Sequence, residues 1–226
     1  MAVRYDAHFL PDKDRPRMYT LYYSPGTASM VVHLALLEIG AEYQLKLVDI
    51  DKSEQHTSEY LKLNPGAKVP TLLIDGWPVY ESGALLIILA ERHPEAKLIP
   101  PIGTPERDAW LQWTVFLSNA LMSTYRFWFY PQELGHQESP PEIRAAVQRK
   151  IESIWDRLEA HLSAHGPYML GNEFSGVDLM LTMLMRWSRN MPRPVTEWPA
   201  LKRLADLVRA RPSWKKLYEL EGLTEW

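Results

Sequence analysis

The segment NPGAKVPTLLIDGWPVYESGALLIILAERH, residues 64–93, decides the fold of the N-terminal part of this chain. Two short apolar runs, residues 71–74 and 77–81, flank an Asp-Gly dipeptide, which accepts the positive φ angles of a tight hairpin turn. We therefore expect two antiparallel strands. Ser82 follows as a helix cap, and the leucines behind it lie along one face of a helix.

The residues before this segment predict a strand, a helix and a second strand. A β-prone run at residues 19–23 ends at a Pro-Gly turn, and apolar residues then recur at helical spacing over residues 30–39. Residues 43–50 alternate polar and apolar positions, and the intervening helix makes the two strands parallel through a right-handed crossover. A short helical stretch at residues 58–63 separates this βαβ unit from the ββα unit that follows it.

The rest of the chain lacks the alternation of strands and predicts an all-helical bundle. Apolar residues recur at helical spacing in several long stretches. These stretches cover residues 105–130, 141–165, 175–190 and 198–210, with a last short one that ends at residue 220.

Shifts in composition along the chain predict its domain boundaries. Residues 1–17 interleave charges with prolines and contain no apolar run, so we interpret them as an extension before the first strand. Residues 98–104 belong to a proline-rich linker between two domains. We expect an α/β domain at residues 18–97 and an all-helical domain at residues 105–226.

The composition excludes several classes of function. Of 226 residues, 46% are apolar and 23% are charged, which is typical of a globular protein. A formal net charge of -3 provides no field that would recruit a nucleic-acid backbone or a membrane surface. No apolar run is long enough to span a bilayer, so we expect a cytoplasmic protein. Because cysteine is absent, any thiol in the chemistry must come from the substrate.

Two places in the small domain carry groups that could hold one extended ligand. A cis peptide at Val69-Pro70 would leave the backbone of Val69 free to pair with a peptide-like ligand, whereas the commoner trans form would only start a strand. Ser82 and the first N–H groups of its helix suit a carboxylate, and Glu81 suits an ammonium group. The alternative for Ser82 is a helix cap alone.

Hydroxyl groups also lie before the first helix. Thr27 and Ser29 follow the Pro-Gly turn, where a hydroxyl and the helix dipole favour an anion. The pKa of a free thiol is about 8.5, and each unit by which the site lowers it requires about 1.4 kcal/mol of preferential stabilisation of the thiolate. One hydroxyl and a helix N-terminus can supply this energy, so a thiolate suits this position. The alternative is that these hydroxyls only cap the helix.

The motifs YYSPGTAS, NPGAKVPTL and DGWPVYESGALLIILAERH, in the order βαβ-ββα-helical, resemble the cytosolic glutathione transferase family. The resemblance covers the chain from about Met18 to its C-terminus and is nearest to bacterial-type members, in the beta, delta and theta-like classes. It implies a thioredoxin-like first domain, a helical second domain, a homodimer, and glutathione as co-substrate without a metal.

The resemblance also implies roles for residues of the small domain. Pro70 would be cis, and Val69 would pair with the cysteinyl backbone of glutathione. Glu81 and Ser82 would hold its γ-glutamyl end. Lys68 stands where the family often places a polar side chain near the glycyl carboxylate, and its charge suits that role.

The residue that activates the thiol departs from the family patterns. A delta-type pattern, in which a serine directly follows Pro-Gly, assigns the thiolate contact to Thr27. In the beta-type pattern a cysteine stands at the place of Ala28 and a tyrosine at that of Tyr23. Because that cysteine is missing, we expect Thr27 to stabilise the thiolate, with Ser29 and then Tyr23 as alternatives.

Two pairs of residues in the helical domain have recognisable spacing. Ser175 and Asp178 are three apart at the start of an apolar helix, as in a capping box, a structural feature that the family shares. His161 and His165 are four apart on a helix, but no third ligand completes a set, so we expect no metal.

We expect an enzyme that adds the glutathione thiolate to an apolar electrophile, with a role in detoxification. The family places its electrophile pocket between the first bundle helix and the small domain, which indicates Trp113, Phe116 and Ala120. A glutathione-dependent isomerase or dehalogenase would need the same thiolate. The competing hypothesis is a non-catalytic member of the fold that serves as a protein-interaction module.

Overall fold

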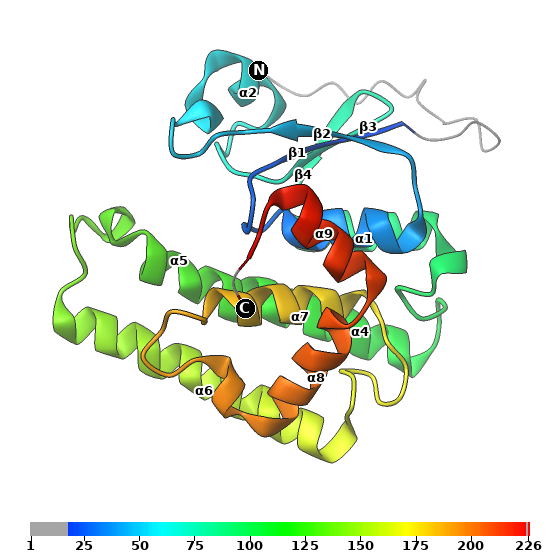
Figure 1. The fold of residues 1–226 in the computed structure, drawn as a ribbon, viewed down its shortest axis with the longest axis vertical. Coiled ribbons are helices and arrows are strands. Elements are labelled where there is room, and N and C mark those ends of the chain that lie inside the picture. Colours follow the sequence, from blue (N-terminus) through cyan, green and yellow to red (C-terminus); the bar gives the residue numbers. More distant parts are fainter. Residues whose placement is uncertain (1–17, 225) are drawn as a thin grey trace.

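The computed structural model describes residues 18–224 and 226, so the predicted extension at residues 1–17 lies outside the described residues. An α/β domain lies on a larger helical domain (Figure 1). The four-stranded sheet has the order β2-β1-β3-β4, in which β1 and β2 are parallel and β3 is antiparallel to both neighbours. The strands are β1 (Tyr19–Tyr23), β2 (Tyr43–Leu47), β3 (Thr71–Ile74) and β4 (Trp77–Tyr80).

The helices of the small domain complete the predicted βαβ-ββα order, which is confirmed. They are α1 (Met30–Ile39), α2 (Ser58–Leu63) and α3 (Ser82–Arg92). Helices α1 and α3 pack together between the sheet and the helical domain (Figure 1). Asp75 and Gly76 have φ angles of 54° and 85°, the left-handed values that the predicted hairpin turn requires.

The second domain is helical, as predicted, and its first helix contains an irregularity that periodicity did not predict. A π-helical segment, η3 (Leu117–Met122), separates α4 from α5. The helices are α4 (Pro105–Phe116), α5 (Ser123–Phe129), α6 (Pro141–His165), α7 (Gly176–Trp187), α8 (Pro199–Arg209) and α9 (Pro212–Glu221). Within residues 18–224, no helix is long and apolar enough to cross a membrane.

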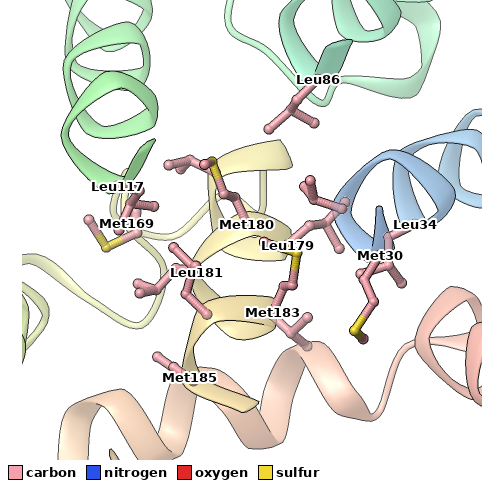
Figure 2. Close-up of a cluster of buried hydrophobic side chains, with 14 of the residues drawn as sticks. Met30, Leu34, Leu86, Leu117, Met169, Leu179, Met180, Leu181, Met183 and Met185 are labelled. Atoms are coloured by element: carbon pink, nitrogen blue, oxygen red, sulfur yellow. The ribbon is translucent and has the colours of Figure 1, made fainter. Parts of the chain in front are cut away.

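Helix α7 is the centre of the core and joins the two domains. Every residue from Gly176 to Arg186 is buried, and most of them are apolar; the polar ones, Asp178, Thr182 and Arg186, recur every fourth position and therefore lie on one face. Figure 2 shows its leucine and methionine side chains between Met30 of α1, Leu86 of α3 and Leu117 of η3. The small domain and the helical domain therefore share one hydrophobic core.

The predicted capping box at the start of α7 is confirmed. Asp178 is fully buried, and its carboxylate accepts the N–H groups of Ser175 and Met169, each at 2.8 Å. Burial raises the pKa of Asp178 to about 7, although the hydrogen bonds that it accepts act in the opposite direction.

Candidate active site

The Val69-Pro70 peptide bond is cis, as the resemblance implied. It lies just before β3, whose pairing with β1 begins at Thr71. Pro70 is buried, Val69 is half-buried and Lys68 is exposed. The backbone around Val69 is therefore outside the sheet ladder and close to the surface, where a peptide-like ligand could pair with it.

The start of α3 differs from the sequence prediction in one respect. Glu81 occupies the N-cap position with a φ of 75°, and Ser82 is the first helical residue rather than the cap. The Ser82 hydroxyl donates to the carbonyl oxygen of Ala28 at 3.1 Å, just before α1. The N-termini of α1 and α3 therefore lie side by side, and both favour a negative charge there.

Two hydroxyls before α1 share one acceptor, the carbonyl oxygen of Ser24. The Thr27 Oγ1 atom donates to it at 2.7 Å, and the Ser29 Oγ atom donates to it at 3.0 Å. Ser29 is fully buried and also accepts the backbone N–H of Ser24, whereas Thr27 is half-buried. Of these two residues, Thr27 is therefore the more exposed to a ligand.

Tyr23 ends β1 beside these hydroxyls. Its ring meets the ring of His33 edge-on, with the centroids 6.1 Å apart. Burial, and secondly the negative charge of Glu221, raise the pKa of Tyr23 above its ordinary value. Tyr23 therefore stays protonated and could donate a hydrogen bond, but the site opposes its ionisation.

Gly26, in the turn before Thr27, is held from both sides by the helical domain. Its N–H donates to Glu221 Oε2 at 2.9 Å, and its carbonyl accepts the Trp187 indole N–H at 3.1 Å. Gly26 has a φ of 72°, and an added Cβ would stand 3.0 Å from a guanidinium nitrogen of Arg186. Glycine is therefore required here by both conformation and space.

A buried hydrogen-bond chain continues from this turn and was missed by the sequence analysis. Glu221 Oε1 lies 2.8 Å from His33 Nδ1, and His33 Nε2 lies 2.9 Å from the Tyr43 hydroxyl. The side chains of His33 and Glu221 are fully buried. The only sequence signal was a histidine within an apolar helix, since its partner lies 188 residues away in the chain.

The predicted electrophile residues lie on the long helix of α4, η3 and α5. Trp113 is buried, and its ring lies 5.6 Å from Phe116 and 4.5 Å from His161 of α6. The Arg157 guanidinium lies 4.3 Å above the Phe116 ring. Trp113 and Phe116 therefore contact α6, while Ala120 is half-buried within η3.

The helix face that meets the small domain carries hydroxyl residues that the sequence analysis did not select. A Cβ added to Gly83 would stand 2.7 Å from the Ser118 hydroxyl and 3.7 Å from a methyl group of Thr114. Gly83 directly follows Ser82, so the junction of α4 and η3 lies against the start of α3. The small size of Gly83 permits this approach.

His161 and His165 of α6 contact each other, and His161 also contacts the backbone of Met169. The two rings lie 5.0 Å apart, and His161 Nε2 lies 2.9 Å from the Met169 carbonyl oxygen. Over the part of the chain that the structure describes, no three histidine, aspartate or glutamate side chains are grouped so that they could hold a metal ion.

Comparisons with known proteins identify the family of both domains. Residues 18–91 match the glutathione S-transferase N-terminal domain, and residues 141–219 match the glutathione S-transferase C-terminal domain. Glutathione S-transferase GstA of Escherichia coli O157:H7 is 25% identical over 205 residues, which cover 90% of this chain and 98% of that protein.

Solved structures give the same result. A glutathione transferase from Methylococcus capsulatus str. Bath is 30% identical with a TM-score of 0.82, over 91% of this chain and 100% of that one. A sphingomonad glutathione S-transferase complexed with glutathione is 27% identical with a TM-score of 0.79, over 91% and 100% of the two chains. With both domains matched in order and solved glutathione transferases matched over their full length, the chain belongs to the glutathione S-transferase family and is a glutathione transferase.

Proposed function

We propose that glutathione binds along the backbone of Val69 and across the paired N-termini of α1 and α3, and that Thr27 stabilises its thiolate. The observation that carries this proposal is the difference between the two hydroxyls at Ser24, because only Thr27 is accessible while Ser29 is sealed inside. A half-buried hydroxyl at a helix N-terminus is well suited to donate to an anion.

The remaining glutathione contacts follow from the same geometry. The exposed carboxylate of Glu81 pairs with the ammonium group of the γ-glutamyl end, and the free N–H groups at the start of α3, beginning with that of Ser82, hold its carboxylate. Lys68 is exposed and directly precedes Val69, and its ammonium group pairs with the glycyl carboxylate. The three contacts together fix the sulfur near Thr27.

Ser29 and Tyr23 are the alternative activators. Ser29 would have to break two buried hydrogen bonds before it could meet a ligand. Tyr23 has a raised pKa, so it could assist as a hydrogen-bond donor beside Thr27. Both arguments favour Thr27 as the principal contact.

The co-substrate is an apolar electrophile bound beside the helix that contains Trp113, Phe116 and Ala120. Among these residues, Ala120 is supported by its place in η3, the segment that begins beside the start of α3. Isomerase or dehalogenase chemistry would use the same thiolate with a different acceptor. A detoxifying conjugation is the general form of this reaction.

The chain also functions as a homodimer in this proposal. Trp77 and Tyr80 on the edge strand β4 expose 40% and 43% of their surface, and Val115 on α4 exposes 51%. Large apolar side chains with this exposure on both domains support an interface with a second copy of the chain.

Turnover tests the proposal. Purified protein is titrated with glutathione and then assayed for thioether formation with an aryl halide. We expect glutathione binding and turnover in the wild type and in Thr27→Ser, and turnover at least tenfold lower in Thr27→Val. Binding without turnover in the wild type would instead support the protein-interaction alternative.

A further inference from the structure

A buried polar cluster lies directly behind the glutathione-binding backbone. Tyr60 of α2 and Asn64, which follows that helix, are 4% and 3% exposed. The Tyr60 hydroxyl donates to the Lys68 carbonyl oxygen at 2.7 Å, and Asn64 Nδ2 donates to the same oxygen at 2.8 Å. Two buried side chains thus converge on one backbone acceptor.

The other groups of the cluster fix these two donors in place. The hydroxyl of Thr71, at the start of β3, lies 2.9 Å from the Tyr60 hydroxyl and accepts from Asn64 Nδ2 at 3.2 Å. Asn64 Oδ1 accepts the N–H of Gly66 at 2.9 Å. Because Tyr60 donates to Lys68, its oxygen is left to accept the proton of Thr71.

The Lys68 carbonyl and the Val69 N–H belong to the same peptide plane. In a trans peptide these two groups point in opposite directions, so fixing one fixes the other. Two buried donors therefore hold the carbonyl toward the interior and turn the Val69 N–H toward the surface. This N–H is the group that pairs with the ligand in the proposed function.

We propose that Tyr60 and Asn64 are positioning residues for glutathione, which act by orienting the Lys68-Val69 peptide plane. The inference rests on the proposed function of Val69. It predicts that loss of either donor weakens glutathione binding and leaves the chemistry at the sulfur unchanged, since neither residue shares a hydrogen bond with Thr27.

The test compares Tyr60→Phe with Tyr22→Phe as a matched control. The rings of Tyr22 and Tyr60 are 5.9 Å apart, edge to face, and the Tyr22 hydroxyl makes no hydrogen bond to the described residues. We expect Tyr60→Phe to raise the Kd and the KM for glutathione about three- to tenfold, the effect of one hydrogen bond. The kcat at saturating glutathione and the pKa of the bound thiol should stay within about twofold and about 0.3 units of wild type.

Asn64→Asp provides a second variant, because it keeps the acceptor for Gly66 and removes the donor to Lys68. It should show the same rise in KM without a fall in kcat. If both variants lower the melting temperature but bind glutathione as wild type does, the two residues only stabilise the fold and the inference is rejected.

A readout without glutathione separates this inference from the proposed function. In the ligand-free protein, the amide resonance of Val69 should shift in Tyr60→Phe and stay in place in Tyr22→Phe. An unmoved resonance in Tyr60→Phe rejects the inference. A shifted resonance in a protein that fails to bind glutathione supports the orientation of the peptide plane and rejects the proposed function alone.

Discussion

At the scale of single residues, the proposed thiolate contact depends on the carbonyl oxygen of Ser24. It accepts the hydroxyls of both Thr27 and Ser29, whose oxygens lie 2.9 Å apart. When Thr27 turns its proton to a thiolate, Ser29 still satisfies the carbonyl. The change therefore leaves no buried acceptor without a partner, which keeps its cost low.

Substitution of Thr27 should mainly affect activity, and substitution of Ser29 should mainly affect stability. Thr27→Val should lower kcat/KM at least tenfold and change the free energy of unfolding by less than about 0.5 kcal/mol, because its hydroxyl is half-buried. Ser29→Ala removes two buried hydrogen bonds and should lower that free energy by about 1–2 kcal/mol. Urea unfolding and steady-state kinetics measure both quantities, and a reversed pattern would assign the thiolate to Ser29.

Asp178 should make stability depend on pH. Its folded pKa of about 7 lies above its ordinary value of 3.8, so the folded state binds an extra proton between these values. Its contribution is therefore full below about pH 4 and falls by about 1.4 kcal/mol per unit as the pH rises to about 7. Asp178→Asn should lack this slope in urea unfolding between pH 5 and about 7. Parallel profiles for the two proteins would show that Asp178 is ionised in the folded state.

At the scale of elements, α9 closes the site from the far end of the chain. Glu221, its last residue, binds both the turn before Thr27 and His33 inside α1. Local periodicity predicted α9 only as a short helix that ends at residue 220, whereas the structure extends it to Glu221. The hydrogen bond from the Gly26 N–H to Glu221 joins residues 195 positions apart, so no local sequence pattern could predict it.

Glu221→Ala should loosen the turn before Thr27. It leaves the Gly26 N–H and His33 without their buried acceptor, and we expect a loss of about 2–3 kcal/mol in the free energy of unfolding. The rate of amide hydrogen exchange at Gly26 should rise by more than the loss in the global free energy of unfolding accounts for. Lys216→Ala, whose exposed partner is Glu219, is the control and should do neither. Equal exchange at Gly26 in Glu221→Ala and wild type would contradict this assignment.

Elements with strong local signals could be predicted from the sequence, and the others could not. Asp75-Gly76 specified its hairpin because the turn needs left-handed φ angles, and Ser175 with Asp178 marked the start of α7. Segment η3 lies in a continuous helical pattern, so its wider turn has no separate signal. The proposed function of Tyr60 depends on its hydrogen bond to the Lys68 carbonyl oxygen, and only the folded loop brings these two groups together.

The whole molecule behaves as one unit, because α7 lies in a core that both domains share. A second link is the bidentate ion pair in which Arg211 of the loop before α9 donates twice to Glu38 of α1, both at 2.7 Å. Ser213 also donates to Glu38. The turn at Gly26, which Glu221 and Trp187 hold, therefore depends on the correct placement of one domain on the other.

Glu38→Gln should weaken the interaction of α1 with Arg211 and leave the two domains packed together. We expect a loss of about 1 kcal/mol in the free energy of unfolding and a single cooperative transition in calorimetry. Asp206→Asn, which breaks exposed pairs with Lys202 and Arg209, should cost less than about 0.5 kcal/mol. Two transitions in Glu38→Gln would show that the shared core does not couple the domains.

The most direct measurement is the ultraviolet thiolate absorbance of bound glutathione as a function of pH, in wild type, Thr27→Ser and Thr27→Val. We predict that the bound thiol in wild type and Thr27→Ser has a pKa at least one unit below the free value of about 8.5, and that Thr27→Val moves it back toward that value. A lowered pKa that survives Thr27→Val, or none in wild type, would contradict the assignment of Thr27.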